Sequence, residues 1–183
     1  PQYTKAFNEL QYVDQTYYNN DPRYIMASLK RDVFDLSMRV NVSFTPELSL
    51  QYYAQPYIFV GKYDDYKRIT DPRAEDYSQR FNTFSADEIS YNDAWKAYLI
   101  DENHDGETDY GFYKPDFHFL QFRSNMVLRW EYKTGSSLYL VWSQGRNDIQ
   151  EDAEDSFGRY LKDMREIHPR NDIMLKISYL LVF

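Results

Sequence analysis

Cysteine is absent from the 183-residue sequence, and no run of apolar residues is long enough to form a transmembrane helix. The lack of cysteine excludes disulfides and cysteine-ligated metal sites, and it fits many compartments, including an oxidising periplasm or cell surface. A spanning helix needs about 20 predominantly apolar residues, so the sequence predicts no helical membrane span. The first residues, PQYTKAFNEL, are not a signal peptide. Because the chain begins at Pro1 and not at Met, we expect a processed product or a piece of a longer polypeptide.

Positive charge is scarce, with 21 Lys and Arg against 29 Asp and Glu and a net charge of -8. This acidic balance argues against nucleic-acid binding, which uses a basic surface. Length and negative mean hydropathy alone suggest one soluble acidic domain. Aromatic residues, however, make up 19% of the chain. Most of them lie at alternating positions, which is typical of β-strands.

Alternation of apolar and polar residues predicts five strands. In residues 34–44 every even position is apolar and every odd position is polar. The sequence TPEL then predicts a turn, with Pro46 in a turn position, and residues 48–58 form the returning strand. A second hairpin is predicted from residues 119–132, the turn KTGS and the apolar positions from 138 to 142. The segment DIMLKISYLLVF predicts the fifth strand.

Long polar segments separate these hairpins, at about residues 61–116 and 144–171, and we expect a short surface helix within the second. Tight turns at one end of the strands and long loops at the other are typical of bacterial outer-membrane barrels, whose long loops are extracellular. The predicted fold is therefore all-β, an antiparallel transmembrane outer-membrane β-barrel. Residues 1–183 would form the C-terminal part of a single barrel domain, with about five to six strands.

The two faces of the predicted strands have different chemistry, and we expect the apolar face to meet lipid and the polar face to line a wet lumen. A β-sandwich has a similar alternation, but spanning strands need about 9–11 residues, whereas globular strands mostly have about 5–6. The predicted strands have the greater length. The lipid-facing positions include Met38, Val40, Leu50, Leu128 and Leu140. The lumen-facing positions are Arg39, Asn41, Gln51, Arg123, Asn125, Arg129 and Glu131. We expect Arg129 and Glu131 to form an ion pair and not an acid/base pair for catalysis.

The last strand ends on Phe183. If both short turns are periplasmic, the alternation of strand directions places Phe183 in the periplasm, where a terminal aromatic residue is predicted to act as an assembly signal. Five or six strands cannot close a membrane barrel, for which at least eight are usual. The predicted partners are therefore outer-membrane lipid and the remainder of the barrel, from the same or another chain.

The segment DENHDGETD, residues 101–109, resembles the first nine positions of a calcium loop, with oxygen-bearing side chains at alternating positions and Gly106 at the sixth. The twelfth position is Phe112 where a calcium loop has a bidentate Glu, so Asp116 is a candidate replacement ligand, and an acidic surface turn is the alternative interpretation. The candidate calcium ligands are Asp101, Asn103, Asp105, Glu107 and Asp109. The histidines His104, His118 and His168 have no metal-ligand spacing, and no catalytic motif is present.

The segments SFTPELSLQYYAQPYIFVGKY and DFHFLQFRSNMVLRWEYKTGSSLYLVWSQ, with the terminal strand, resemble a C-terminal domain of unknown function. That domain occurs in Bacteroidetes surface proteins with an N-terminal family 9 carbohydrate-binding-like domain, and the resemblance extends from about Arg23 onward. It implies an outer-membrane location and a role in surface glycan handling, or as an anchor or conduit in an outer-membrane complex, with glycans or other surface proteins as partners. Some family members carry a hydrolase label that no residue here supports. The alternative is a soluble, calcium-stabilised β-sandwich that binds carbohydrate.

Overall fold

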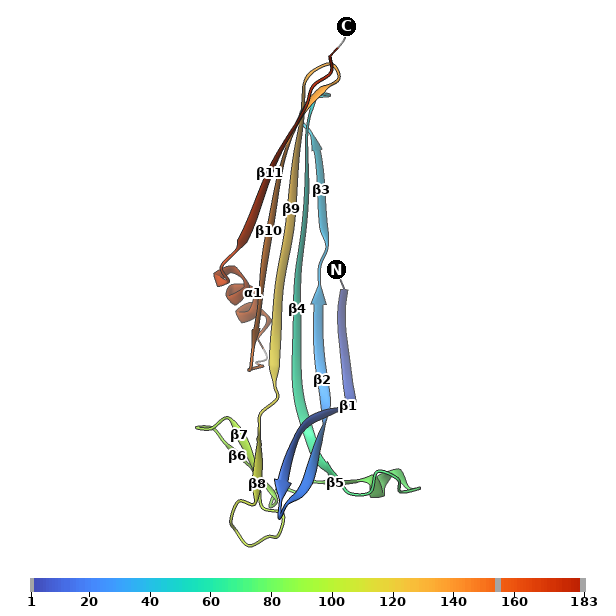
Figure 1. Ribbon diagram of the computed structural model, residues 1–183, viewed down its shortest axis with the longest axis vertical. Helices are drawn as coiled ribbons and strands as arrows, with labels where there is room; N and C mark the ends of the chain where they lie inside the picture. Colours follow the sequence, from blue (N-terminus) through green and yellow to red (C-terminus); the bar gives the residue numbers. More distant parts are fainter. Residues whose placement is uncertain (1, 154–155, 182–183) are drawn as a thin grey trace.

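The computed structural model describes residues 2–153 and 156–181 and has the expected all-β, antiparallel fold. The strands of the main sheet follow the order β1-β2-β4-β9-β10-β11, and β3 and β5 also pair with β4 (Figure 1). In the described residues this sheet is open and does not close into a barrel. Its strands are β1 (Gln2–Tyr18), β2 (Asp21–Asp35), β3 (Met38–Ser43), β4 (Leu48–Ile69), β5 (Phe81–Thr83), β9 (Phe117–Lys133), β10 (Ser136–Gln150) and β11 (Arg170–Ser178).

A small second sheet lies far from the two predicted hairpin turns (Figure 1). The turns that join β3 to β4 and β9 to β10 lie together at one end of the long sheet, and the small sheet lies at the other. A 3-10 helix, η1 (Tyr77–Arg80), precedes it, and an α-helix, α1 (Phe157–Glu166), joins β10 to β11. The strands of the small sheet are β6 (Ile89–Asn92), β7 (Ala97–Ile100) and β8 (Tyr110–Tyr113). Within the described ranges, none of the helices could cross a membrane.

The predicted strand over residues 34–44 is interrupted, because β2 ends at Asp35 and β3 begins at Met38. Both strands pair with β4, and the interruption lies opposite Pro56. Proline has no backbone N–H to donate to a neighbouring strand. The backbone N–H of Leu36 bridges this place by donating to the carbonyl oxygen of Pro56 at 3.2 Å. The register continues unchanged on either side, so the alternation seen in the sequence is preserved.

The sequence did not predict the N-terminal hairpin, in which β1 pairs with β2 through a turn at Asn19 and Asn20. Both asparagines have positive φ, 50° and 65°, as a two-residue type I′ hairpin turn requires. In this hairpin, ion pairs between the two strands take the place of the alternating apolar residues that mark the other strands in the sequence. Arg31 of β2 bonds Glu9 of β1 at 2.9 Å.

The predicted long loops are shorter than expected, because three strands continue beyond the apolar stretches. β4 continues to Ile69, β10 continues to Gln150, and β11 begins at Arg170. Charged residues on these extensions pair across strands, as Lys30 of β2 does with Asp64 of β4. The backbone hydrogen bonds between strands thus continue into segments where apolar and polar residues no longer alternate. The expected short helix in the second segment is α1.

Near the hairpin turns the described part of the sheet is a single layer. Every residue of β3 and of β11 is exposed, whichever face its side chain occupies. A soluble sheet normally buries one face against a second layer, and here neither the small sheet nor α1 lies on this half. The half of the sheet nearest the turns therefore has two open faces.

The opposite half has a packed layer on each face. On one face, Tyr160 and Met164 of α1 pack against Ile58 and Leu120 of the sheet, and a partly buried Phe34 joins them. On the other face, Ile25 and Ala27 of β2 pack with Tyr66 of β4 against the small sheet. Alternation along β2 separates Phe34 from Ile25 and Ala27, because residues an odd number apart point to opposite faces. Helix and small sheet therefore cover opposite faces.

Candidate functional site

The polar residues predicted to line a lumen lie on one face of the sheet. Residues directly opposite in an antiparallel pair point to the same side, and Arg39 lies opposite Tyr53, which lies opposite Asn125. The next row joins Asn41 to Gln51. Two further pairs on the same face are Arg123 with Gln55 and Arg129 with Ser49. Glu131 follows two residues after Arg129 and shares its face.

This polar face is hollowed near β3. A groove of about 330 Å³ is lined by Arg39, Asn41, Gln51, Tyr53 and Asn125, among others. The Arg39 guanidinium lies 5.8 Å from the Tyr53 ring centroid, within the range of a cation–π contact. The Tyr53 hydroxyl in turn donates to the side-chain oxygen of Gln55 at 2.9 Å. The groove offers hydrogen-bond donors, acceptors and one positive charge, which suits a polar solute or water.

Arg129 and Glu131 form the expected ion pair, with 2.8 Å between Nη2 and Oε2. The other carboxylate oxygen of Glu131 accepts a hydrogen bond from the backbone N–H of Gly135 at 3.1 Å. Both oxygens of the carboxylate are thus engaged, one by the arginine and one by the hairpin turn. This arrangement orders the turn and does not resemble a general acid or base poised for substrate.

In the half of the sheet nearest the turns, the opposite face carries unbroken rows of apolar residues. One row joins Val42, Leu50, Leu128, Leu140 and Leu175 across five strands. The next row joins Val40, Tyr52, Met126, Trp142 and Ile173. All five positions predicted to face lipid belong to this face. Several of its side chains are more than half exposed, such as Ile173 at 72% and Leu175 at 60%.

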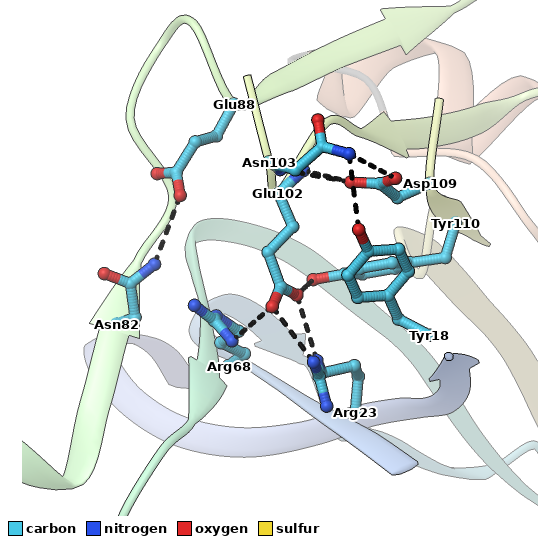
Figure 2. Close-up of polar contacts among 9 residues, drawn as sticks. All are labelled: Tyr18, Arg23, Arg68, Asn82, Glu88, Glu102, Asn103, Asp109 and Tyr110. Carbon is cyan, nitrogen blue, oxygen red and sulfur yellow. Dashed lines mark hydrogen bonds and ion pairs between the residues drawn. The ribbon is translucent and has the colours of Figure 1, made fainter. Parts of the chain in front are cut away.

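A buried charge cluster around Glu102 joins the small sheet to the main sheet (Figure 2). Arg23 of β2 binds the Glu102 carboxylate with two hydrogen bonds, from Nε to Oε2 at 2.9 Å and from Nη2 to Oε1 at 3.0 Å. Arg68 of β4 donates to Oε1 at 2.7 Å, and the hydroxyl of Tyr110 on β8 donates to Oε2 at 2.7 Å. The Arg23 guanidinium also lies 5.5 Å from the Tyr18 ring centroid.

The environment of Glu102 keeps its carboxylate ionised. Burial by itself would raise its pKa, but the hydrogen bonds from Arg23 and Tyr110 and the charge of Arg68 outweigh burial and lower the pKa below its usual value. Burial and the bond to Glu102 raise the pKa of Tyr110 in turn. A carboxylate saturated by three partners has no role as a base, so the cluster is a structural joint between the two sheets.

The candidate calcium loop is wrapped by bonds between its side chains and backbone. Asp101 accepts from the N–H of Gly106 at 2.8 Å, and Asp109 accepts from the N–H of Glu102 at 2.8 Å. The side-chain amide nitrogen of Asn103 donates to Asp105 at 3.0 Å and to Asp109 at 3.4 Å. The carboxylates of Asp105 and Asp109 thus both bond the side-chain amide nitrogen of Asn103.

Other predicted ligands lie elsewhere or make other bonds. The side chain of Asp105 also accepts from the backbone N–H of Glu107 at 2.9 Å. Asp116, the candidate replacement ligand, is buried and binds the N–H of Tyr63 at 2.8 Å and Lys114 at 2.9 Å. Within residues 2–153 and 156–181, no three His, Cys, Asp or Glu side chains form a group that could hold a metal ion.

The histidines His104 and His118 make separate contacts. His104 approaches Asp87 at 3.5 Å at the surface. His118 is fully buried, with its Nδ1 2.8 Å from Asp152 and its ring against Tyr160 of α1. It therefore ties the segment before α1 to β9. Phe183, the predicted assembly signal, lies outside the described residues.

Sequence reasoning missed the Glu102 cluster. Arg23 and Arg68 are separated from Glu102 by 79 and 34 positions, so no local spacing connects them. The sequence showed an arginine in each of two neighbouring strands and a glutamate within the candidate calcium loop, but no pattern that linked these charges. Comparisons of the chain with protein-family models, with curated proteins and with solved structures gave no match.

Proposed function

We propose that this chain forms part of the wall of an outer-membrane β-barrel, with the apolar rows against lipid and the polar face toward the lumen. The observation that carries this proposal is the single-layered half of the sheet, which exposes a wide apolar face opposite a polar one. Soluble monomers rarely expose apolar patches larger than a few hundred Å². In a barrel wall, lipid-facing and lumen-facing residues alternate along each strand, so the same pattern would bury that face in the bilayer.

The dimensions of the apolar face support the same function. Its rows run from Leu48 to about Pro56 on β4, which is about nine residues and corresponds to one tilted membrane-spanning strand. Beyond Pro56 the strands carry ion pairs and the covering elements. We infer that this second half projects outside the membrane on the extracellular side.

The proposal requires further strands. Within the described residues, β3 pairs only with β4 and β11 pairs only with β10 in the half that carries the apolar rows, and a free strand edge in hydrocarbon costs several kcal/mol for each unsatisfied group. The remainder of the barrel, from the same or another chain, would therefore pair with these two edges. The resemblance to the C-terminal domain of Bacteroidetes surface proteins supports this, because that family is identified with longer barrels.

Within such a wall the small sheet β6–β8 would cover the extracellular end of the lumen face, because it packs on the face that carries the polar residues. The Glu102 cluster would hold it there. We propose that the barrel serves as an anchor or conduit in a surface complex that handles glycans. The alternative, a soluble carbohydrate-binding β-sandwich, would need a second sheet over the apolar rows, and none lies there among the described residues.

We also propose that the Asp101–Asp109 loop binds calcium weakly, with the carboxylates of Asp105 and Asp109, which the side-chain amide nitrogen of Asn103 bridges, supplying two of the hard oxygen ligands that calcium prefers. Calcium titration followed by isothermal calorimetry tests this, with an expected weak affinity of about 10⁻⁴–10⁻³ M. The double variant Asp105→Asn, Asp109→Asn should lose the binding heat. Equal binding heats for the variant and the wild type would contradict the calcium site and support the alternative interpretation, an acidic surface turn.

Flotation with liposomes tests the membrane assignment. The chain, diluted from urea into liposomes at a concentration that lets several copies pair through their free edges, should float with lipid, resist protease in its turn half and show β-sheet circular dichroism. A chain that folds as a soluble monomer without lipid or detergent would contradict the assignment. Release of a small sugar from loaded liposomes then separates a conduit from an anchor, since only a conduit with an open lumen releases it.

A further inference from the structure

We propose that the groove between α1 and the outer face of the sheet binds a phosphate-bearing lipid at the outer boundary of the bilayer. This inference rests on the proposed membrane function, because the groove opens on the same face as the apolar rows. Its volume is about 540 Å³, within the usual range of ligand sites. The apolar lining includes Tyr52, Phe122 and Trp142 from the sheet and Leu161 and Met164 from the helix.

The groove continues the apolar face directly. Tyr52 and Trp142 belong to the same cross-strand row as Val40 and Ile173, so an acyl chain leaving the groove would lie along this row. The side chains of α1 extend the apolar lining outward. Leu161 is 39% exposed, although apolar residues on a short surface helix usually point inward. A lipid tail would cover it.

Two arginines supply the polar end. Arg146 and Arg165 line the groove, and the lining contains no carboxylate. Arg146 is fixed in place, because its Nη1 donates to the carbonyl of Arg165 at 2.6 Å, at the C-terminal end of α1. Its Nε is buried and has no hydrogen-bond partner among the described residues, so the guanidinium keeps an unused donor.

The chemistry of these groups selects a phosphate headgroup. Guanidinium groups bind phosphate oxygens by charge-assisted hydrogen bonds, and arginine is preferred where such recognition is needed. Aromatic side chains at the edge of the apolar band lie at headgroup level in barrels. Arg146 lies opposite Phe122 and one row beyond Gln144 and Ser124, so the two charges lie just outside the apolar rows, at the level of lipid headgroups.

Native mass spectrometry of the full chain in maltoside detergent tests this site. Dioleoyl phosphatidate is compared with dioleoylglycerol, which has the same acyl chains and lacks the phosphate, and with inorganic phosphate. We expect one phosphatidate to be retained per chain, at least tenfold more strongly than dioleoylglycerol, and inorganic phosphate not to be retained. Equal retention of the two lipids, or retention of inorganic phosphate alone, would overturn the proposal.

Substitutions localise the binding. Arg165→Gln should lower phosphatidate retention at least fivefold, and adding Leu161→Gln should lower it further. Lys162→Gln is the matched control, because Lys162 is a mostly exposed cation on the same helix that pairs with Glu166; its removal should leave retention unchanged. Equal losses in Arg165→Gln and Lys162→Gln would mean nonspecific charge attraction and refute the site. Flotation of each variant with liposomes distinguishes the two proposals, since a failed lipid site leaves membrane insertion intact.

Discussion

Arg23 and Glu102 lie 79 positions apart in the chain and form a two-bond ion pair that joins the main sheet to the small sheet. Their side chains are only 18% and 11% exposed. A charge buried to this degree is costly unless its partners are in place. The pair therefore makes the position of the small sheet depend on one carboxylate.

Replacing Glu102 with Gln should loosen the small sheet, because Arg23 and Arg68 would both lose their charged partner. We expect a local destabilisation of about 1.5–3 kcal/mol, the usual range for hydrogen bonds to charged groups. Hydrogen exchange should become faster in β7 and β8 and stay unchanged in the turn half of β9 and β10. Uniformly faster exchange in all strands would show that the cluster has no local role.

Acid should have the same effect as this substitution. The folded-state pKa of Glu102 is lowered, so its contribution is fully present above the unfolded value of about 4.3 and is lost as pH falls below it. Glu88 acts in the same direction, since hydrogen bonds from Ser85 outweigh burial and lower its pKa. Exchange protection of β7 and β8, corrected for intrinsic rates, should fall below about pH 4. Glu102→Gln should show a smaller pH dependence, and an unchanged profile would contradict this account.

The two strand faces should tolerate charge differently. Leu128→Arg puts a charge in the middle of the apolar rows, where arginine costs about 2–4 kcal/mol in a membrane barrel. Asn125→Arg, on the same strand, puts the charge on the polar face beside Arg39 and should be tolerated. The fraction of folded protein in liposomes, measured by protease resistance, compares them. Equal tolerance at both positions would refute the assignment of the faces.

The hairpin turn between β9 and β10 requires glycine. Gly135 has a φ of +76°, and a Cβ there would lie 2.5 Å from a methyl group of Leu180. Gly135→Ala should therefore destabilise the fold by about 1 kcal/mol or more. Gly158→Ala is the control, because no atom lies within 4 Å of its added Cβ and alanine favours a helix over glycine by up to about 1 kcal/mol. Urea unfolding midpoints should move in opposite directions, and a shared direction would contradict the turn geometry.

Alternation in the sequence was sufficient to predict the two central hairpins and the division of their residues between two faces, because a period of two maps directly onto a pleated sheet. It could not predict the N-terminal hairpin, in which ion pairs such as Arg31 with Glu9 replace apolar residues. The interruption at Leu36 depends on Pro56, which lies on the neighbouring strand. The Glu102 cluster joins residues from β2, β4 and β8, and only the folded chain brings these together.

The central claim, that the apolar rows face lipid, can be tested most directly at two positions of β10 that lie three residues apart and on opposite faces of the sheet. Because the chain has no cysteine, a single cysteine at Leu140 or at Ser143 can carry a spin label without competing sites. In liposomes, electron paramagnetic resonance should find the label at Leu140 accessible to oxygen and shielded from a water-soluble nickel reagent, with the reverse at Ser143. Equal exposure of both labels to the nickel reagent would contradict the claim.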